Sequence, residues 1–299
     1  MNNLKRKLRK ITAFDVVVHA IGFFLFAIVA YPLILVLSSS FSNPSLVAQG
    51  RVVFFPKEFN LMGYEEVFKN KDIMTGYANT IFYTVVGTII NLMVTVPAGY
   101  VLSKGKRVVG NNLFTTIFLI TMYFSGGMIP TFLLNQSLGL YNTRAVLLIM
   151  GAFNVHNCII CRSFFVGMPK ELEEAAYIDG CSVFKTFLQI VLPLSKALLG
   201  VMVLYFAVGH WNSYFNAMIY TYDQKIQPLQ LVLRRILVLE QSSAEMVSGG
   251  GDELAAERQY LAALIKYAVI IVSSLPLMII YPFLQKYFEK GVLIGSVKG

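Results

Sequence analysis

The stretch Glu173–Leu194, EEAAYIDGCSVFKTFLQIVLPL, differs in character from the sequence on either side of it. Three acids fall within its first seven residues, a glycine stands at position 180, and the apolar run that follows contains Pro193. The flanking residues are apolar over long distances and carry few charges. The location of this charged segment relative to a membrane therefore decides how the chain is organised.

The composition places the chain in the membrane class. Of its 299 residues, 56% are hydrophobic and 14% are charged, whereas soluble domains have about 25% charged residues. The net charge of +9 is explained by the preference of Lys and Arg for cytoplasmic loops, so we expect no nucleic-acid partner. Three cysteines are too few for a disulfide framework.

Six segments are apolar enough, over about 20 residues, to cross the hydrocarbon core of a bilayer. The first follows a basic N-terminus but exceeds the apolar core of a signal peptide, so we predict an uncleaved membrane helix. Several segments contain Pro or Gly, which a helix bundle tolerates when its neighbours satisfy the backbone. The segments are 16–38, 79–102, 113–134, 144–165, 196–218 and 261–284.

The distribution of basic residues predicts that both ends lie in the cytoplasm. Five Lys and Arg residues precede the first span, three follow the second, and the loop 135–143 has no charge. The fold class is therefore an all-α integral membrane protein with six transmembrane helices. The predicted parts are a basic N-terminus 1–15, a first helix 16–38, an extracellular loop 39–78, a core 79–285 and a tail 286–299. Within the core we expect a cytoplasmic loop 167–195 and an extracellular loop 219–260.

The opening stretch is then the largest cytoplasmic loop, and its residues predict two helices joined by a turn. Pro169 suits the first helical position, and the acids that follow it complement the helix dipole. Gly180 suits a helix C-terminus and Ser182 suits the N-cap of a second helix. Pro193 is expected to kink the passage into the fifth span.

This loop resembles the EAA loop of binding-protein-dependent ATP-binding-cassette importer permeases of type I. The resemblance is carried by Glu174-Ala175-Ala176, Gly180 four residues later, and Ile190-Val191-Leu192-Pro193. In that family the loop forms a coupling helix that docks on a separate ATPase. The resemblance therefore implies an ATPase-coupling role for Glu173, Glu174, Ala175, Ala176, Asp179 and Gly180.

Two further stretches are similar to the carbohydrate branch of the same family, namely Phe206–Phe215 and Pro282–Gly299. The resemblance implies an importer of carbohydrates, such as oligosaccharides or polysaccharide fragments. It also implies four kinds of partner: a second, homologous permease in a heterodimer, two ATP-binding-cassette subunits, an extracytoplasmic solute-binding protein and the lipid bilayer. A permease for peptides, amino acids or metals would carry a similar loop.

The chain itself lacks the residues of an ATPase. It has no G-x-x-x-x-G-K-[ST] motif, the pattern that cradles phosphates and holds magnesium. We therefore expect ATP and Mg²⁺ on the partner subunit, no cofactor here and no enzymatic activity. The histidines lack metal-ligand spacing, and Cys158 and Cys161 lack the context of a redox pair, so we expect no metal site and structural cysteines.

The substrate pathway is less clearly marked. Asn154 and Asn157 lie with the two cysteines on one stripe of the fourth span, where they either line a hydrophilic pathway or form interhelical hydrogen bonds. Trp211, Asn212 and Tyr214 belong to a polar, aromatic patch that suits either sugars or the membrane interface. The stretch Tyr123–Phe132, with two glycines and Pro130, indicates either a break in the third span or close packing.

An ion-driven carrier is the main alternative from another class. Such a carrier predicts paired carboxylates within the membrane or an inverted repeat. The predicted spans have almost no acids in their cores, and Asp15 lies at the edge of the first. A membrane-embedded enzyme would need a catalytic pair at membrane depth, and the sequence offers none.

Overall fold

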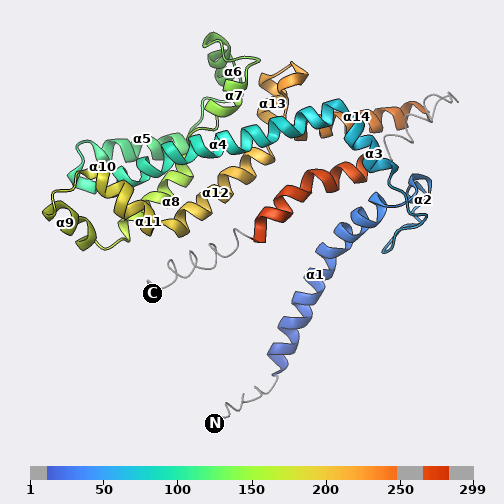
Figure 1. Cartoon of the computed structure of the whole chain (residues 1–299), viewed down its shortest axis with the longest axis horizontal. Coiled ribbons are helices and arrows are strands. Elements are labelled where there is room, and N and C mark those ends of the chain that lie inside the picture. The colour runs from blue at the N-terminus through green and yellow to red at the C-terminus, as the bar shows by residue number, and fades with distance from the viewer. Residues whose placement is uncertain (1–11, 248–264, 283–299) are drawn as a thin grey trace. The chain divides into compact units, whose positions relative to one another are not determined.

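The computed structural model describes residues 12–247 and 265–282 (Figure 1), and every regular element in these ranges is helical. The chain divides into two units. One contains residues 1–69 and 237–272, and the other contains residues 70–236 and 273–299.

The first unit begins with α1 (Ala13–Ser40), followed by α2 (Pro44–Ala48) and α3 (Met62–Lys69). Thr12 and Asp15 form a capping box at the start of α1, which satisfies two of the unpaired N–H groups there. The most apolar 18-residue window of α1 buries none of its residues within the chain. A long helix that is apolar all round requires an apolar environment, which a bilayer supplies.

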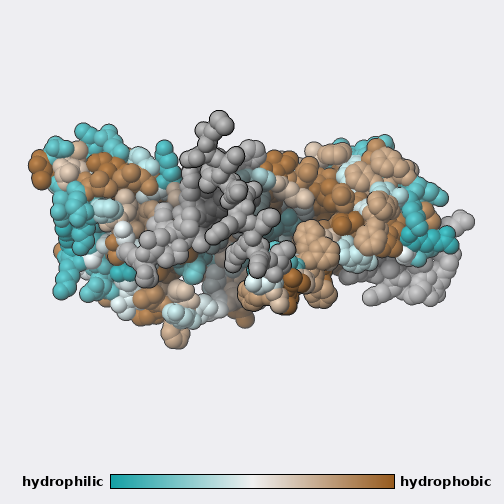
Figure 2. Space-filling view, turned by 90° about the horizontal axis from the view of Figure 1, so that it is seen from below, coloured by the Kyte–Doolittle hydropathy of each residue, from teal (hydrophilic) through white to brown (hydrophobic). Residues whose placement is uncertain are grey.

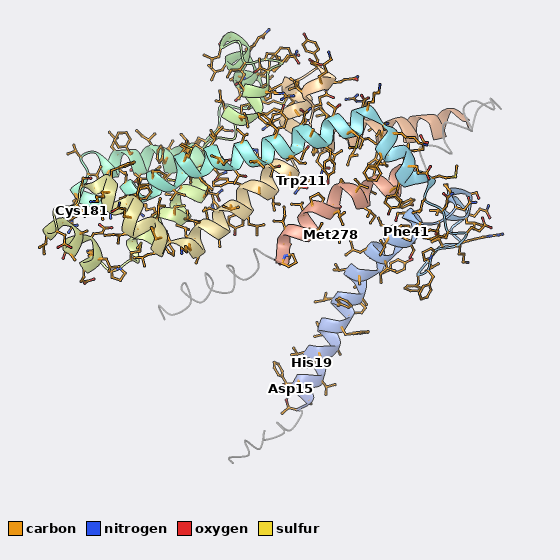
Figure 3. The ribbon with its side chains drawn as sticks, viewed as in Figure 1. Asp15, His19, Phe41, Cys181, Trp211 and Met278 are labelled. Carbon is orange, nitrogen blue, oxygen red and sulfur yellow. The ribbon has the colours of Figure 1, made fainter. Side chains whose placement is uncertain are left out.

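The segment after α1 folds back on the end of that helix. The Phe41 ring stacks on Phe59 and Tyr64, with ring centroids 5.7 and 5.1 Å away, and the Tyr64 hydroxyl donates to Ser40 Oγ at 2.8 Å. Figure 3 labels Phe41 at this turn. The predicted first outside loop, 39–78, is therefore partly helical, because α3 and the start of the next helix lie within it.

The second unit is built around α4 (Lys71–Ser103), which packs along α8 (Val155–Val166) and α12 (Lys196–Trp211). Figure 1 shows these helices alongside one another. Their core contains Val96, Tyr100, Cys161, Phe165, Phe187, Val191, Leu198, Met202 and Phe206. α4 begins eight residues before the predicted second span because Asn70 caps it, its side chain accepting from Asp72 N and Ile73 N.

The predicted third, fourth and fifth spans are interrupted. α5 (Asn111–Tyr123) and α6 (Met128–Ser137) meet at 115°, with Gly127 at φ +84° between them. Of the two alternatives left open for Tyr123–Phe132, the structure therefore shows the break. α7 (Arg144–Ile149) is separated from α8 by five residues, and α13 (Phe215–Tyr220) is separated from α12.

In the described ranges, three helices are long and apolar enough to cross a membrane: Ala13–Ser40, Lys71–Ser103 and Ile265–Pro282. Two bent pairs raise this to five. A count of six, and the orientation of the ends, stay predictions. The predicted outside loop 219–260 contains η3 (Gln224–Ile226) and α14 (Leu229–Val247), and residues 248–260 lie outside the described ranges. So do the N-terminal residues 1–11 and the tail 286–299.

Candidate functional site

The predicted coupling segment forms a short helix, α9 (Glu171–Ile178). Lys170 is its N-cap, so the prediction that Pro169 occupies the first helical position is wrong. Gly180 has φ +73°, and the bonds from Gly180 N to Tyr177 O and from Cys181 N to Ala176 O form the double closure typical of a helix C-terminus with glycine. The predicted stop at Gly180 is therefore confirmed.

The helix α9 has an inner and an outer face. Glu173 and Ala176 are buried within the chain, whereas Glu174, Ala175, Asp179 and Gly180 are exposed. The outer face also exposes large apolar side chains, most fully Ile178 at 86%. The six predicted coupling residues therefore divide into two that contact this chain and four that are accessible to a partner.

The two central acids of α9 have different partners. The Glu173 carboxylate pairs with Lys104 Nζ, and these side chains are only 11% and 16% exposed. The Glu174 carboxylate lies 3.3 Å from Arg107 Nη2, and both of these side chains are more than half exposed. Because water screens an exposed pair and makes it weak, Glu174 can exchange Arg107 for another partner, whereas Glu173 cannot do so without leaving a buried charge.

Lys104 is the C-cap of α4, so the Glu173 pair joins α9 to the end of the central helix. Two other side chains bind the last carbonyls of α4. Asn111 Nδ2 donates to Leu102 O at 3.1 Å, and Arg162 Nε donates to the same oxygen at 3.3 Å. The unpaired acceptors at this helix end are thus satisfied by residues of α5 and α8.

Figure 2 shows hydrophilic residues gathered at the end of the second unit where α9 lies. The exposed charged residues of α9 and of the segments next to it include Lys106, Arg107, Lys170, Glu171 and Glu174. Such a surface suits an aqueous face rather than the hydrocarbon core.

After α9 the chain bends sharply into α12. Ser182 caps α10 (Val183–Thr186), with its side chain accepting from Lys185 N, which confirms the predicted N-cap. A π-helical turn (η2, Phe187–Val191) and α11 (Leu192–Leu194) follow. The axis then turns by 83° at Ser195, two residues after Pro193, close to the predicted kink. A π-helical turn is often found at functional sites.

The fourth-span residues do not form one polar stripe. Asn154 is the N-cap of α8, and its Oδ1 accepts from Asn157 N at 3.0 Å. Asn154 is exposed and Asn157 is half-buried, but Cys158 and Cys161 are fully buried. The cysteines lie where α8 crosses Gly99 of α4, and a Cβ at Gly99 would lie 2.5 Å from the Cys161 Cβ. In the structure they are packing residues at a close helix crossing.

The predicted polar, aromatic patch is also divided. Trp211 is buried, with its Nε1 donating to Ser273 O at 3.0 Å and its ring edge-on to Tyr77; Figure 3 labels it at the end of α12. Asn212 and Tyr214 are exposed. Asn212 Nδ2 donates to Val208 O at 3.0 Å, and the Arg234 guanidinium lies 5.4 Å from the centre of the Tyr214 ring. The assignment of these residues to a substrate pathway stays a prediction.

A buried polar network lies at the interruption between α7 and α8, and the sequence analysis missed it. Asn91 of α4 donates to the Gly151 carbonyl within the interruption. Its Oδ1 lies 2.7 Å from His210 Nε2, so this ring nitrogen carries the proton. The network satisfies a carbonyl that the broken helix leaves without its usual partner.

A second missed cluster holds the start of α14 against α4. Asn79 Nδ2 donates to Lys225 O and Gln227 O at 2.8 and 3.0 Å, and Tyr83 OH donates to Ile226 O at 2.7 Å. Thr80 Oγ1 accepts from Leu229 N at 2.8 Å. The sequence signal was a run of polar residues inside an apolar span, but no local pattern indicated their partners.

Within residues 12–247 and 265–282, no group of three or more His, Cys, Asp or Glu side chains could hold a metal ion. The candidate site consists of the outer face of α9 and of the Lys104–Glu173 ion pair, which joins the inner face of α9 to the C-terminal end of α4.

We expect Asn157→Leu to lower substrate uptake while the chain still folds. Asn157 is half-buried on α8, and a leucine removes its side-chain amide, which the predicted substrate pathway would use, while the backbone bond from Asn157 N to Asn154 Oδ1 is kept. Uptake of labelled substrate and the thermal unfolding midpoint should be measured together. Unchanged uptake would assign Asn157 to packing, and Ser163→Leu on the same helix is the control for added bulk.

Comparison with known proteins extends over nearly the whole chain. Residues 73–294 match the family described as binding-protein-dependent transport system inner membrane component. The protein LplC of Bacillus subtilis (strain 168) is 42% identical over 91% of this chain and 90% of its own length. The polygalacturonan/rhamnogalacturonan transport system permease protein YtcP of the same organism is 35% identical over 96% of this chain and 98% of its own length.

The fold is also found in a solved structure. The crystal structure of a bacterial ABC transporter involved in the import of the acidic polysaccharide alginate contains a chain with a TM-score of 0.83 and 34% sequence identity. The match covers 94% of this chain and 98% of that one.

Proposed function

The chain belongs to the family of binding-protein-dependent transport system inner membrane components, and from this premise we propose that it forms half of the pore of a carbohydrate importer. Its substrates would be oligosaccharides or polysaccharide fragments. The observation that carries the proposal is the whole-chain likeness, in sequence and fold, to the permease of an alginate importer.

The names of two relatives support acidic carbohydrates as the substrates of this chain. Alginate is described as an acidic polysaccharide, and YtcP is named for polygalacturonan and rhamnogalacturonan, which contain galacturonate. This chain exposes Arg144 and Arg234 in its second unit, and guanidinium groups bind carboxylates well. We infer that acidic oligosaccharides are the preferred substrates.

In the proposed complex a second, homologous permease completes the pore, and an extracytoplasmic solute-binding protein delivers the sugar. Two ATPase subunits bind ATP and Mg²⁺. The outer face of α9, with Glu174, Ala175, Asp179 and Gly180, docks on one of them. Closure of the ATPase pair then shifts the permease between inward-open and outward-open states, and the work comes from the difference in nucleotide affinity between those states.

The test is substrate-stimulated ATP hydrolysis by the complex reconstituted in liposomes. We expect stimulation by oligogalacturonides or alginate oligomers with the matching binding protein, and weaker stimulation by neutral oligosaccharides of equal length. Stimulation by a peptide, amino acid or metal ion, with none by any glycan, would overturn the carbohydrate assignment. Transport that follows a sodium or proton gradient without ATP would overturn the importer itself.

We expect Gly180→Val to detach the ATPase while the membrane helices still fold. A valine at φ +73° is strained, at a cost of roughly 1–2 kcal/mol, and relief of the strain would displace the end of α9. Gly139→Val is the matched control, because Gly139 also has positive φ and open space around it but lies in the loop after α6. Co-purification of the ATPase should fall only for Gly180→Val, and equal co-purification for both variants would contradict the assignment.

A further inference from the structure

The link between α9 and the rest of the chain is concentrated at one ion pair. Lys104 Nζ contacts the Glu173 carboxylate, and the same ammonium lies 3.9 Å from the centre of the Tyr100 ring. Building on the proposed function, we propose that Lys104 and Glu173 form the link that transmits displacement of α9 to α4, with Tyr100 as its platform. These are positioning residues, and the proposal gives Glu173 a role different from docking.

The burial of the Lys104–Glu173 pair supports a role in transmission for Glu173 and a role in docking for Glu174. Glu173 and Lys104 are 11% and 16% exposed, whereas Glu174 and Arg107 are 55% and 58% exposed. A pair shielded from water attracts more strongly than one in contact with it. Displacement of Glu173 alone would leave two poorly solvated charges, so the lysine is drawn along with the carboxylate.

The position of Lys104 lets the pair act on the whole bundle. Lys104 follows the last residue of α4, Ser103, and α4 packs along both α8 and α12. The carbonyl of Leu102, two residues earlier, is bound by Asn111 and Arg162. A displacement of Lys104 therefore reaches a helix end that is already joined to α5 and α8.

The surroundings of the pair leave α9 few other attachments. A cavity of about 240 Å³ lies beside it and is lined by Ser103, Lys104, Gly105, Arg107, Phe165, Val166, Met168, Lys170 and Glu173. Apolar packing does not fill this space, so the helix contacts the bundle through a small number of groups. Of the α9 side chains, Glu173 and Ala176 are the two that are buried, and Glu173 is the charged one.

The Tyr100 ring supplies a second contact for the Lys104 ammonium. Tyr100 is buried in the core, against Phe165 and Phe187, so its ring is held in place. A cation over an aromatic face is attracted to it. The ammonium thus contacts both the ring and the Glu173 carboxylate, so two groups hold it in place.

The test measures substrate imported per ATP hydrolysed in the complete complex in liposomes. We expect Lys104→Met to retain ATPase binding and ATP hydrolysis but to lower this ratio about tenfold, within the usual range for coupling between sites. Glu173→Gln should do the same. Lys106→Met is the matched control, because Lys106 is an exposed lysine of the same loop, and it should leave the ratio unchanged.

Two further variants keep the test decisive if a single substitution prevents folding. The charge exchange Lys104→Glu with Glu173→Lys should restore only part of the ratio, because a carboxylate at position 104 loses the attraction of the Tyr100 ring. Lys104→Arg keeps a cation there and should retain more of the ratio. A wild-type ratio in Lys104→Met, or an exchange no better than the single variants, would overturn the proposal. So would loss of ATPase binding in Lys104→Met, because the pair would then serve docking. Failure of Gly180→Val to detach the ATPase would count against the docking face instead.

Discussion

The substitution Gly99→Leu is expected to prevent accumulation of folded protein in the membrane. A Cβ at Gly99 would lie 2.5 Å from the Cys161 Cβ and 3.1 Å from Arg162 N and Cys158 O. Two of these neighbours are backbone atoms that cannot rotate away, so α4 and α8 would have to separate along the crossing that buries both cysteines. Overpacking of a filled interior costs about 1–3 kcal/mol, and a leucine here should reach or exceed the upper value.

The measurement is membrane yield together with the thermal unfolding midpoint of the full chain in detergent. Gly209→Leu is the matched control, because Gly209 lies on α12 with nothing within 4 Å of its added Cβ. We expect a near-normal midpoint for Gly209→Leu and a strongly lowered one for Gly99→Leu. Equal midpoints would show that the crossing can open, and would contradict the close packing of α4 on α8.

The substitution Asn91→Leu is expected to cause the second large loss of stability. Asn91 is 1% exposed and binds both the Gly151 carbonyl and the His210 ring. A leucine would leave both groups unsatisfied in a buried site, and a lost partner of this kind costs about 1–3 kcal/mol for each group. The carbonyl lies where the fourth span is interrupted, so the interruption itself should become less ordered.

A double-mutant cycle separates the energy of the Asn91–His210 hydrogen bond from the effect of the changed side-chain volume. Unfolding free energies of the wild type, Asn91→Leu, His210→Leu and the double variant should show coupling of about 0.6 kcal/mol, the average for side-chain bonds within membranes, and at most about 1.7 kcal/mol. Gly87 supports the choice of partner, since a Cβ there would lie 2.5 Å from the His210 ring, so the histidine cannot move far. Strict additivity would mean that the two side chains do not depend on one another.

Local sequence predicted the C-terminal end of α9 and the N-cap of α10, and it offered a break in the third span as one of two alternatives. Gly180 was identified as a stop and Ser182 as a cap, and both are confirmed. Glycines 126 and 127 were identified near a break, and α5 ends three residues before the first of them. These signals are readable because a cap or a positive φ depends on atoms within about four residues.

Pro169 shows the limit of such signals. Its ring suits a first helical turn, yet the helix begins at Glu171, since helix ends shift by a residue or two with their surroundings. The fourth and fifth predicted spans are interrupted for a related reason. Hydropathy predicted continuous helices through 144–165 and 196–218, but it does not reveal an interruption that a distant side chain such as Asn91 satisfies.

The amino-acid sequence by itself determined the membrane class, the family and the two short helices of the loop, because apolar content, motif spacing and caps are properties of neighbouring residues. Only the tertiary structure decided that Glu173 faces Lys104 while Glu174 faces outward, although the two acids are adjacent in the chain. It also decided that Trp211 packs inside and that Asn91 meets residues 60 and 119 positions away. The physical reason is that a polar side chain takes its role from the partner that burial imposes on it, and that partner is set by the packing of helices that are distant in sequence.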